Sequence, residues 1–280
     1  MDKSPIVRDL SKLRKFNKQS YKIIDILGLQ NYGRTMISNF GRYLILMYRV
    51  FSKPERLRIY VRETIREIES LGLNSIGIVI IISVFIGAVI TLQTRYNLES
   101  SWIPLYLIGL TARDTILLEF SSTMVGLILA GKVGSNIASE IGHMRITEQI
   151  DALEMMGINS ASYLILPKIV AAVLFNPLLT IISMVVGIFG GWMAAIVTGA
   201  LSSADYIYGI QYWFVPFYVT YALVKTVVYA FIITSVSAFY GYYVEGGALE
   251  VGRSSTKGVV YSSILILLSD VILTQLMLAK

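Results

Sequence analysis

The sequence has 280 residues, of which 55% are hydrophobic and only 15% charged, and its mean hydropathy is +0.66. A typical soluble domain has about 25% charged residues, so this composition indicates an integral membrane protein. The chain has no cysteine and a single histidine, His143, which excludes a disulfide framework and any cysteine-based or histidine-rich metal site.

The net charge of +6 is concentrated at the N-terminus. Residues 1–70 carry a balance of +8, and the rest of the chain carries −2. Such a segment could indicate nucleic-acid binding, but basic residues ahead of the first apolar span are more simply a topology signal, so we expect no nucleic-acid partner. No secretory signal peptide is evident, and we expect the N-terminus to be retained in the cytoplasm.

The first part of the chain has two predicted regions. Residues 1–33 are polar and form a basic cytoplasmic segment, and residues 34–72 form interfacial amphipathic and charged helices. Between Arg34 and Phe51, apolar side chains fall within one helical arc and arginines lie opposite. This pattern is typical of a helix in the membrane interface. The alternative is a helix packed against soluble protein.

Five later segments are long and apolar enough to cross a hydrocarbon core of about 30 Å. They cover about residues 73–94, 115–135, 169–200, 213–240 and 258–279. We therefore expect an all-α integral membrane protein with a five-span domain over residues 73–280. Residues 95–110 have only a short apolar run and predict an interfacial loop, and Pro177 predicts a kink in the third span.

A charged segment, residues 139–157, separates the second and third predicted spans. Its apolar side chains repeat at helical spacing: Ile146, Ile150 and Leu153. Glu148 and Asp151 form an acidic ridge on another face, and Gly157 suits a C-terminal cap. This pattern predicts a short helix that docks into another protein, and a solvated connecting loop is the open alternative.

Five spans place the two termini on opposite sides of the membrane. With the basic N-terminus inside, residues 139–157 and the 241–257 loop lie in the cytoplasm and the C-terminus lies in the periplasm. A cytoplasmic ATPase could therefore reach residues 139–157.

Several motifs resemble those of the MlaE permease family, the membrane subunits of ABC-type lipid transporters associated with MCE proteins. The motif EIG-x-M-x-x-x-EQIDALEMMG over residues 140–157 carries the resemblance. LAGKVGSNIASEIG lies upstream, and NPLLTIISMVVGIFGGW and VVYSSILILLSDVILTQLM lie downstream. The resemblance covers Phe85 to the C-terminus, and the first 70 residues match more loosely.

This resemblance implies a homodimeric inner-membrane permease that moves phospholipid between the membrane and an MCE-domain partner. A separate cytoplasmic ATPase would drive it. The residues expected to dock that ATPase are Glu140, Met144, Glu148, Gln149, Asp151 and Leu153. Residues 126–132 superficially match a P-loop, but Val133 stands where Ser or Thr must bind Mg²⁺ and no strand precedes it. We expect no cofactor, no metal and no catalytic residue on this chain.

Three ionisable residues lie inside predicted spans: Glu119, Lys225 and Asp270. Each costs about 2.5–3.5 kcal/mol near a helix centre unless it is paired or hydrated. Lys225 and Asp270 fall near the midplane of consecutive spans, which predicts a structural ion pair. Glu119 is expected nearer the outer face. The family usually has an Arg before this Glu and here the residue is Leu118, so no family charge-pair role is carried over to Glu119.

The outer halves of the first and fifth spans are expected to line a lipid cavity, with Phe85, Glu119 and Leu273 at its wall. Arg95 and Arg113 would add charge near its outer mouth. Small residues at helical spacing favour close helix packing, either within the chain or at a homodimer seam. These pairs are Ser83/Gly87, Gly131/Ser135 and Gly187/Gly191.

Two other functions are consistent with a polytopic membrane protein. A non-transporting scaffold or sensor would need only the docking segment. An intramembrane enzyme has little support, because the sequence shows no paired carboxylates, metal cluster or Ser/His arrangement.

Overall fold

The computed structural model describes residues 38–52, 57–98 and 104–278. These residues are helical and contain no strand, and five helical segments are long and apolar enough to cross a membrane. The predicted all-α class and the five spans are thus confirmed. The described residues up to Tyr48 and those from Arg49 onward belong to two separate units. A helix covers residues 38–51, and its location in a membrane interface stays a prediction. The predicted basic segment, residues 1–33, lies outside the described residues.

The first span is one continuous helical segment, Tyr60–Asn97. It consists of α2 (Leu57–Glu67), the π-helix η1 (Ile68–Leu73) and α3 (Asn74–Asn97). The charged α2 therefore runs directly into the apolar α3, with no loop between them.

The second span is also continuous, over Tyr106–Ile146. Its parts are α4 (Tyr106–Thr115), η2 (Ile116–Met124), α5 (Val125–Leu129), η3 (Ala130–Gly134) and α6 (Ser135–Ile146). The predicted loop over residues 95–110 is thus helical at both ends, in α3 up to Asn97 and in α4 from Tyr106. The reason is tertiary packing, because Ile108 is buried in a cluster with Tyr206 of α9 (Ser203–Gln211).

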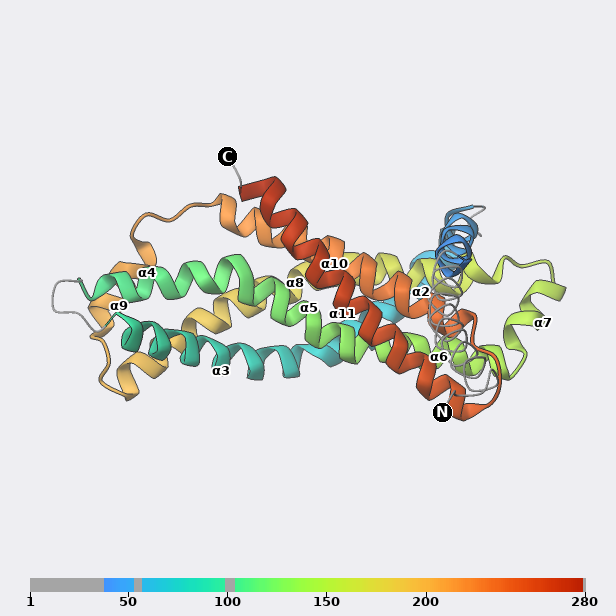
Figure 1. Cartoon of the computed structure of the whole chain (residues 1–280), viewed down its shortest axis with the longest axis horizontal. Helices are drawn as coiled ribbons and strands as arrows, with labels where there is room; N and C mark the ends of the chain where they lie inside the picture. The colour runs from blue at the N-terminus through green and yellow to red at the C-terminus, as the bar shows by residue number, and fades with distance from the viewer. Residues whose placement is uncertain (1–37, 53–56, 99–103, 279–280) are drawn as a thin grey trace, which may run out of the picture. The chain divides into compact units, whose positions relative to one another are not determined.

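The remaining elements are α7 (Gln149–Met155), α8 (Ser160–Val197), α10 (Phe217–Tyr242) and α11 (Ala248–Leu278). Figure 1 shows α4 and α9 at one end of this unit and α7 at the other. The α8 helix continues without a break through Pro167 and Pro177, and a kink at Pro177 stays a prediction.

The fifth span begins ten residues before its predicted start, at Ala248. Two side-chain interactions support this extra helix, one within α11 and one with α6. The Arg253 guanidinium lies 2.5 Å from a carboxylate oxygen of Glu250, and the Ser255 hydroxyl donates to the Ser135 carbonyl oxygen at 3.1 Å. A helix can extend beyond the bilayer when its polar side chains find such partners.

The α3 and α8 helices pack against each other through small residues. A Cβ atom on Gly87 would lie only 1.8 Å from the Gly187 carbonyl oxygen. The Ser83 hydroxyl donates to the Ser183 hydroxyl at 2.8 Å beside this contact. The small pairs of the first and third spans therefore serve packing within the chain.

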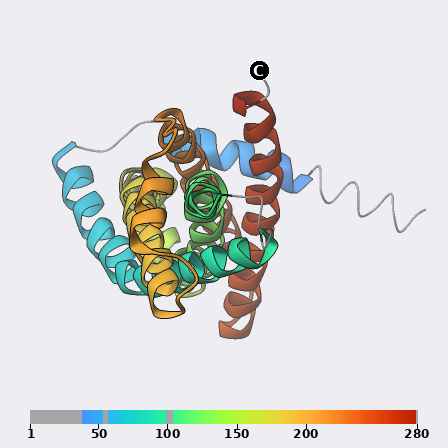
Figure 2. The ribbon, with the colours of Figure 1, turned by 90° about the vertical axis from the view of Figure 1, so that its left-hand side faces the viewer.

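The five spans differ in how much of their surface the chain covers. We compare the most apolar stretch of 18 consecutive residues in each helix. In α10, 67% of these residues are buried, whereas in α11 only 11% are buried. Figure 2 shows α11 at the periphery of the bundle. The described residues of this unit thus leave most of the last span uncovered.

Candidate functional site

Glu119, Lys225 and Asp270 meet inside the bundle and are called the charge cluster below. They come from η2, α10 and α11. The fully buried Lys225 ammonium lies 2.9 Å from a Glu119 carboxylate oxygen and forms a second ion pair with Asp270. The structure therefore brings together the two residues predicted to pair and adds Glu119 as a third.

Hydroxyl groups complete the charge cluster. The Tyr229 hydroxyl donates to Asp270 at 2.8 Å. The Thr123 hydroxyl lies 3.3 Å from carboxylate oxygens of both Glu119 and Asp270. The aromatic ring of Tyr221 faces the Lys225 ammonium, 4.8 Å from its centroid. These contacts supply the partners that a charge in an apolar span requires.

The depth of Glu119 in the membrane stays a prediction, but the start of the second span was expected at about residue 115. The helix in fact begins at Tyr106, and this moves Glu119 away from the span's end. The spacing of Glu119 and Thr123, four residues apart on one helix, was the available signal that both face the same neighbours.

Exposure within the charge cluster is uneven. The Lys225 side chain is 0% exposed, that of Asp270 16% and that of Glu119 42%. A carboxylate with this much free surface in an apolar span is costly against lipid tails. The face of the bundle that carries Glu119 is therefore suited to water or to another protein chain.

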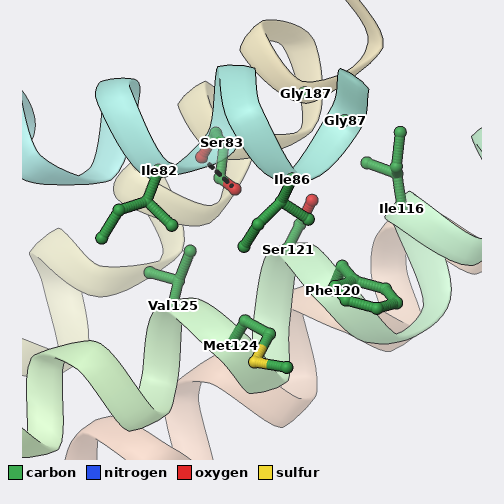
Figure 3. Close-up of a pocket in the computed structure, with 11 residues that line it drawn as sticks. Ile82, Ser83, Ile86, Gly87, Ile116, Phe120, Ser121, Met124, Val125 and Gly187 are labelled. Carbon is green, nitrogen blue, oxygen red and sulfur yellow. Dashed lines mark hydrogen bonds between the residues drawn. The ribbon is translucent and has the colours of Figure 1, made fainter. Parts of the chain in front are cut away.

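Phe85 and Leu273, the other predicted cavity residues, also keep free surface. The Phe85 side chain is exposed and Leu273 is partly exposed. A crevice between α3 and η2 lies nearby, lined by Ile86 and Ser121 among others (Figure 3). Its volume of about 10 Å³ fits roughly one water molecule and no acyl chain. This crevice therefore cannot hold an acyl chain, whereas a separate cavity of about 240 Å³ is lined by Leu117, Ile181 and Phe214 among others.

Ser121 lines the same crevice and is buried without a hydrogen-bond partner for its hydroxyl among the described residues. Buried hydroxyls are normally satisfied by protein or by ordered water. The crevice is thus suited to a single bound water.

Arg113 lines the cavity of about 240 Å³ with Leu117 and Phe214, and its charge is also engaged by other protein groups. Its guanidinium is buried, pairs with Asp114 at 2.7 Å, and donates to the carbonyl oxygens of Ile210 at 2.6 Å and Tyr212 at 2.9 Å. It therefore ties α4 to the connection between α9 and α10. Arg95 is partly exposed and lines a cavity of about 220 Å³ at the same end.

At the opposite end, residues 139–157 form two helices instead of the single predicted one. Glu148 adopts a left-handed conformation, with φ of 59°, and separates α6 from α7. The ion pair between Arg145 and Asp151, at 2.6 Å, spans the break. Gly157 follows α7 with φ of 78° and donates its N–H to the Glu154 carbonyl oxygen at 2.9 Å, the geometry of a C-terminal cap.

The predicted docking residues are not equivalent in the structure. Glu148, Gln149 and Asp151 are exposed, whereas Met144 and Leu153 are partly buried. The sixth, Glu140, is exposed but forms an ion pair with Lys168.

Sequence reasoning missed Met155 and Met156, whose side chains are 85% and 66% exposed at the end of α7. Adjacent methionines after an acidic helix were the available signal, because flexible thioether side chains suit adaptable protein contacts.

Glu154 ties α7 to the bundle. Its carboxylate accepts hydrogen bonds from Ser160 at 2.9 Å, Tyr242 at 3.0 Å and Arg49 at 3.2 Å. Burial alone would raise the pKa of this carboxyl, but the two hydroxyls and the nearby guanidinium lower it below the ordinary value of 4.5. Glu154 therefore holds α7 in place as an anion.

Neither a nucleotide nor a metal site is found in the described part of the chain. The P-loop-like residues 126–132 are helical, within α5 and η3. No three His, Asp or Glu side chains of the described residues gather in a group that could hold a metal ion.

A family model described as Permease MlaE matches residues 64–276. The chain is 35% identical over 246 residues to a probable ABC transporter permease protein of Rickettsia bellii, covering 86% of this chain and 93% of that protein. It is 32% identical to a probable ABC transporter permease protein of Synechocystis, covering 79% and 83%. It is also 31% identical to the chloroplastic protein TRIGALACTOSYLDIACYLGLYCEROL 1 of Arabidopsis thaliana, covering 78% and 62%.

Proposed function

Because the chain belongs to the MlaE permease family, we propose that it is the phospholipid-moving membrane subunit of an ABC-type transporter. In this proposal two copies form the membrane domain in the inner membrane, a separate cytoplasmic ATPase drives it, and an MCE-domain protein exchanges lipid with it outside. The N-terminus is cytoplasmic and the C-terminus periplasmic. The family and the ABC permease names of its relatives support the permease role.

The exposed carboxylate of Glu119 carries the proposal. A side chain that is 42% exposed within an apolar span needs a polar surrounding, which a second copy or a hydrated cavity supplies. The exposed Phe85 offers apolar surface on the first span. A surface with both characters fits an amphiphile better than it fits a sugar, whose hydroxyls would lose water without replacement on apolar walls.

The exposure of α11 supports a homodimer. Only 11% of its most apolar stretch is buried within the chain, although it carries Asp270 on its covered side. A second copy packed along α11 would bring two Glu119 side chains to the same side of the bundle. Two copies would then enclose the cavity that one copy leaves open.

The α6–α7 segment is the proposed site of ATPase docking. It lies at one end of the bundle, and the positive-inside rule assigns this end to the cytoplasm. Exposed apolar side chains in water indicate a contact surface, and Met155 and Met156 provide one beside the exposed Glu148.

Docking can be tested with Glu148→Lys combined with Asp151→Lys. We expect this double variant to lose the ATPase in a pull-down while it still inserts and dimerises, because the acidic face is reversed. Glu245→Lys, an exposed acidic residue in the connection between α10 and α11, is the matched control and should retain the ATPase. Full retention by the double variant contradicts the docking assignment.

Lipid transfer can be tested with Phe85→Gln and Leu273→Gln in a reconstituted complex. We expect both to block ATP-driven transfer of fluorescent phosphatidylethanolamine while assembly and basal ATP hydrolysis persist, because a buried amide cannot pair with an acyl chain. Leu174→Gln on α8 is the matched control, since Leu174 is exposed, at 57% against 68% for Phe85, and does not line the cavity of about 240 Å³. A wild-type complex that moves a sugar or an amino acid but no phospholipid refutes the proposal.

A further inference from the structure

Lys168 binds two carboxylates at the end of the bundle that carries α6 and α7. Its ammonium lies 2.6 Å from a carboxylate oxygen of Glu67 and 2.8 Å from one of Glu140. The three residues belong to α8, α2 and α6, and we call them the Lys168 clamp. They are separate from the charge cluster, and the function proposed above assigns Lys168 no role.

The two arms of the Lys168 clamp differ in exposure. The side chains of Lys168 and Glu67 are 3% and 16% exposed, whereas that of Glu140 is 46% exposed. Separating the inner pair would leave buried charges unpaired, which is strongly unfavourable. Separating Lys168 from Glu140 is much easier, because water can replace the lost partner of an exposed carboxylate. The Glu140 arm is therefore the one that can open and close.

The Lys168 clamp also joins the two helical segments that carry the proposed cavity wall. Glu67 is in the segment that continues through η1 into α3, where Phe85 is exposed. Glu140 is in the segment that includes η2, where Glu119 is exposed. A displacement of α6 thus reaches both segments through one ammonium group.

We propose that Lys168 is a positioning residue that couples movement of the docking segment to the cavity wall. It keeps its pair with Glu67, and the Glu140 arm opens or closes as the ATPase moves α6 and α7. This proposal rests on the proposed function, in which α6 and α7 dock the ATPase. Lys168 itself touches neither ATP nor lipid.

The outer arm is tested with Glu140→Gln in the permease–ATPase complex reconstituted in phospholipid vesicles. The measured quantity is the amount of fluorescent phosphatidylethanolamine moved per ATP hydrolysed. We expect this ratio to fall at least ~5-fold, the lower end of typical coupling between sites, with an unchanged melting temperature. Glu69→Gln is the matched control, because Glu69 is exposed and lies two residues from Glu67.

A charge exchange separates coupling from stability. Glu67→Lys with Lys168→Glu preserves the inner pair but places two carboxylates opposite each other in the outer arm. We expect this double variant to fold. The amount of lipid that it moves per ATP hydrolysed should fall as it does in Glu140→Gln. Adding Glu140→Lys restores opposite charges in the outer arm and should restore the ratio.

The outcomes distinguish this proposal from the function on which it rests. A wild-type complex that hydrolyses ATP but moves no phospholipid refutes the proposed function. The coupling role of the Lys168 clamp is overturned if folded Glu140→Gln moves as much lipid per ATP as the wild type. It is also overturned if the folded triple variant binds the ATPase but does not recover the wild-type amount of lipid moved per ATP. Loss of the ATPase from Glu140→Gln in a pull-down also overturns it, since Glu140 would then be a docking contact.

Discussion

Lys225 is the one cation in the charge cluster, and both carboxylates depend on it. The Lys225 side chain is fully buried between Glu119 and Asp270. Removal of one member of a buried ion pair typically costs about 3–5 kcal/mol, because the charge left behind has neither water nor a partner.

We therefore expect Lys225→Met to destabilise the protein by about this amount in thermal unfolding in detergent. Lys225→Met with Asp270→Asn should cost less than the two single losses added together, because the buried Asp270 charge is gone and the remaining carboxylate, Glu119, is 42% exposed and can be hydrated. Lys257→Met, at an exposed position of α11, is the control and should change the free energy of unfolding by less than about 0.5 kcal/mol. Additive losses would show that Lys225 and Asp270 do not interact.

Single residues were predictable where their depth could be counted along an uncharged span. Lys225 and Asp270 lie on consecutive spans at similar depth, so the sequence alone suggested their contact. Arg113 was not predictable, because its partners include the carbonyl oxygens of Ile210 and Tyr212, about a hundred residues away, and every residue has a carbonyl. Lys168 was passed over because a lysine at the edge of a span is ordinarily a topology signal.

At the scale of elements, the contact of α3 with α8 depends on the missing side chain of Gly87. A Cβ atom there would lie 1.8 Å from the Gly187 carbonyl oxygen, which is backbone and cannot rotate away. The two helices must separate to accommodate even an alanine.

We expect Gly87→Ala to destabilise the protein by at least about 1–3 kcal/mol, the usual cost of overpacking. Gly77→Ala on the same helix is the control, because open space surrounds that position. It should be neutral or should stabilise α3 by up to about 1 kcal/mol, since alanine favours helix more than glycine does. Melting temperatures of the two variants in detergent check this, and equal effects would contradict the packing argument.

The sequence predicted the existence of the helices better than their ends. Long uncharged runs made the spans recognisable, but the start of α4 depends on burial of Ile108 against α9, which no local pattern encodes. The break between α6 and α7 was missed for a similar reason. Local propensity favours a continuous helix through Glu148, whereas burial of Ile150 accompanies the turn that a left-handed residue makes.

At the scale of the whole molecule, the uncovered surface of α11 predicts where a second copy packs. The chain has no cysteine, so single cysteines can be introduced without background. We expect a cysteine at Leu268, Val271 or Ile272 to form a disulfide-linked dimer in oxidised membranes, provided that the two Cα atoms lie within about 7 Å. These side chains are 56%, 65% and 58% exposed.

A cysteine at Val185 on α8 is the control for this cross-linking. Its exposed fraction of 64% matches that of Val271, and it lies on α8 instead of α11. Gel mobility without reducing agent measures the product. Cross-linking through Val185 but through none of the α11 positions would place the dimer seam elsewhere.

The short connection between α10 and α11 has a consequence for biosynthesis. Lys225 and Asp270 each cost about 2.5–3.5 kcal/mol when they enter a bilayer alone. Only residues 243–247 separate the two helices, so α11 follows α10 closely out of the ribosome. The opposite charges can then neutralise each other before either helix is released into lipid. The last two spans are therefore suited to enter the membrane together, as a helical hairpin, and a nascent chain that stops after α10 would leave Lys225 without that partner.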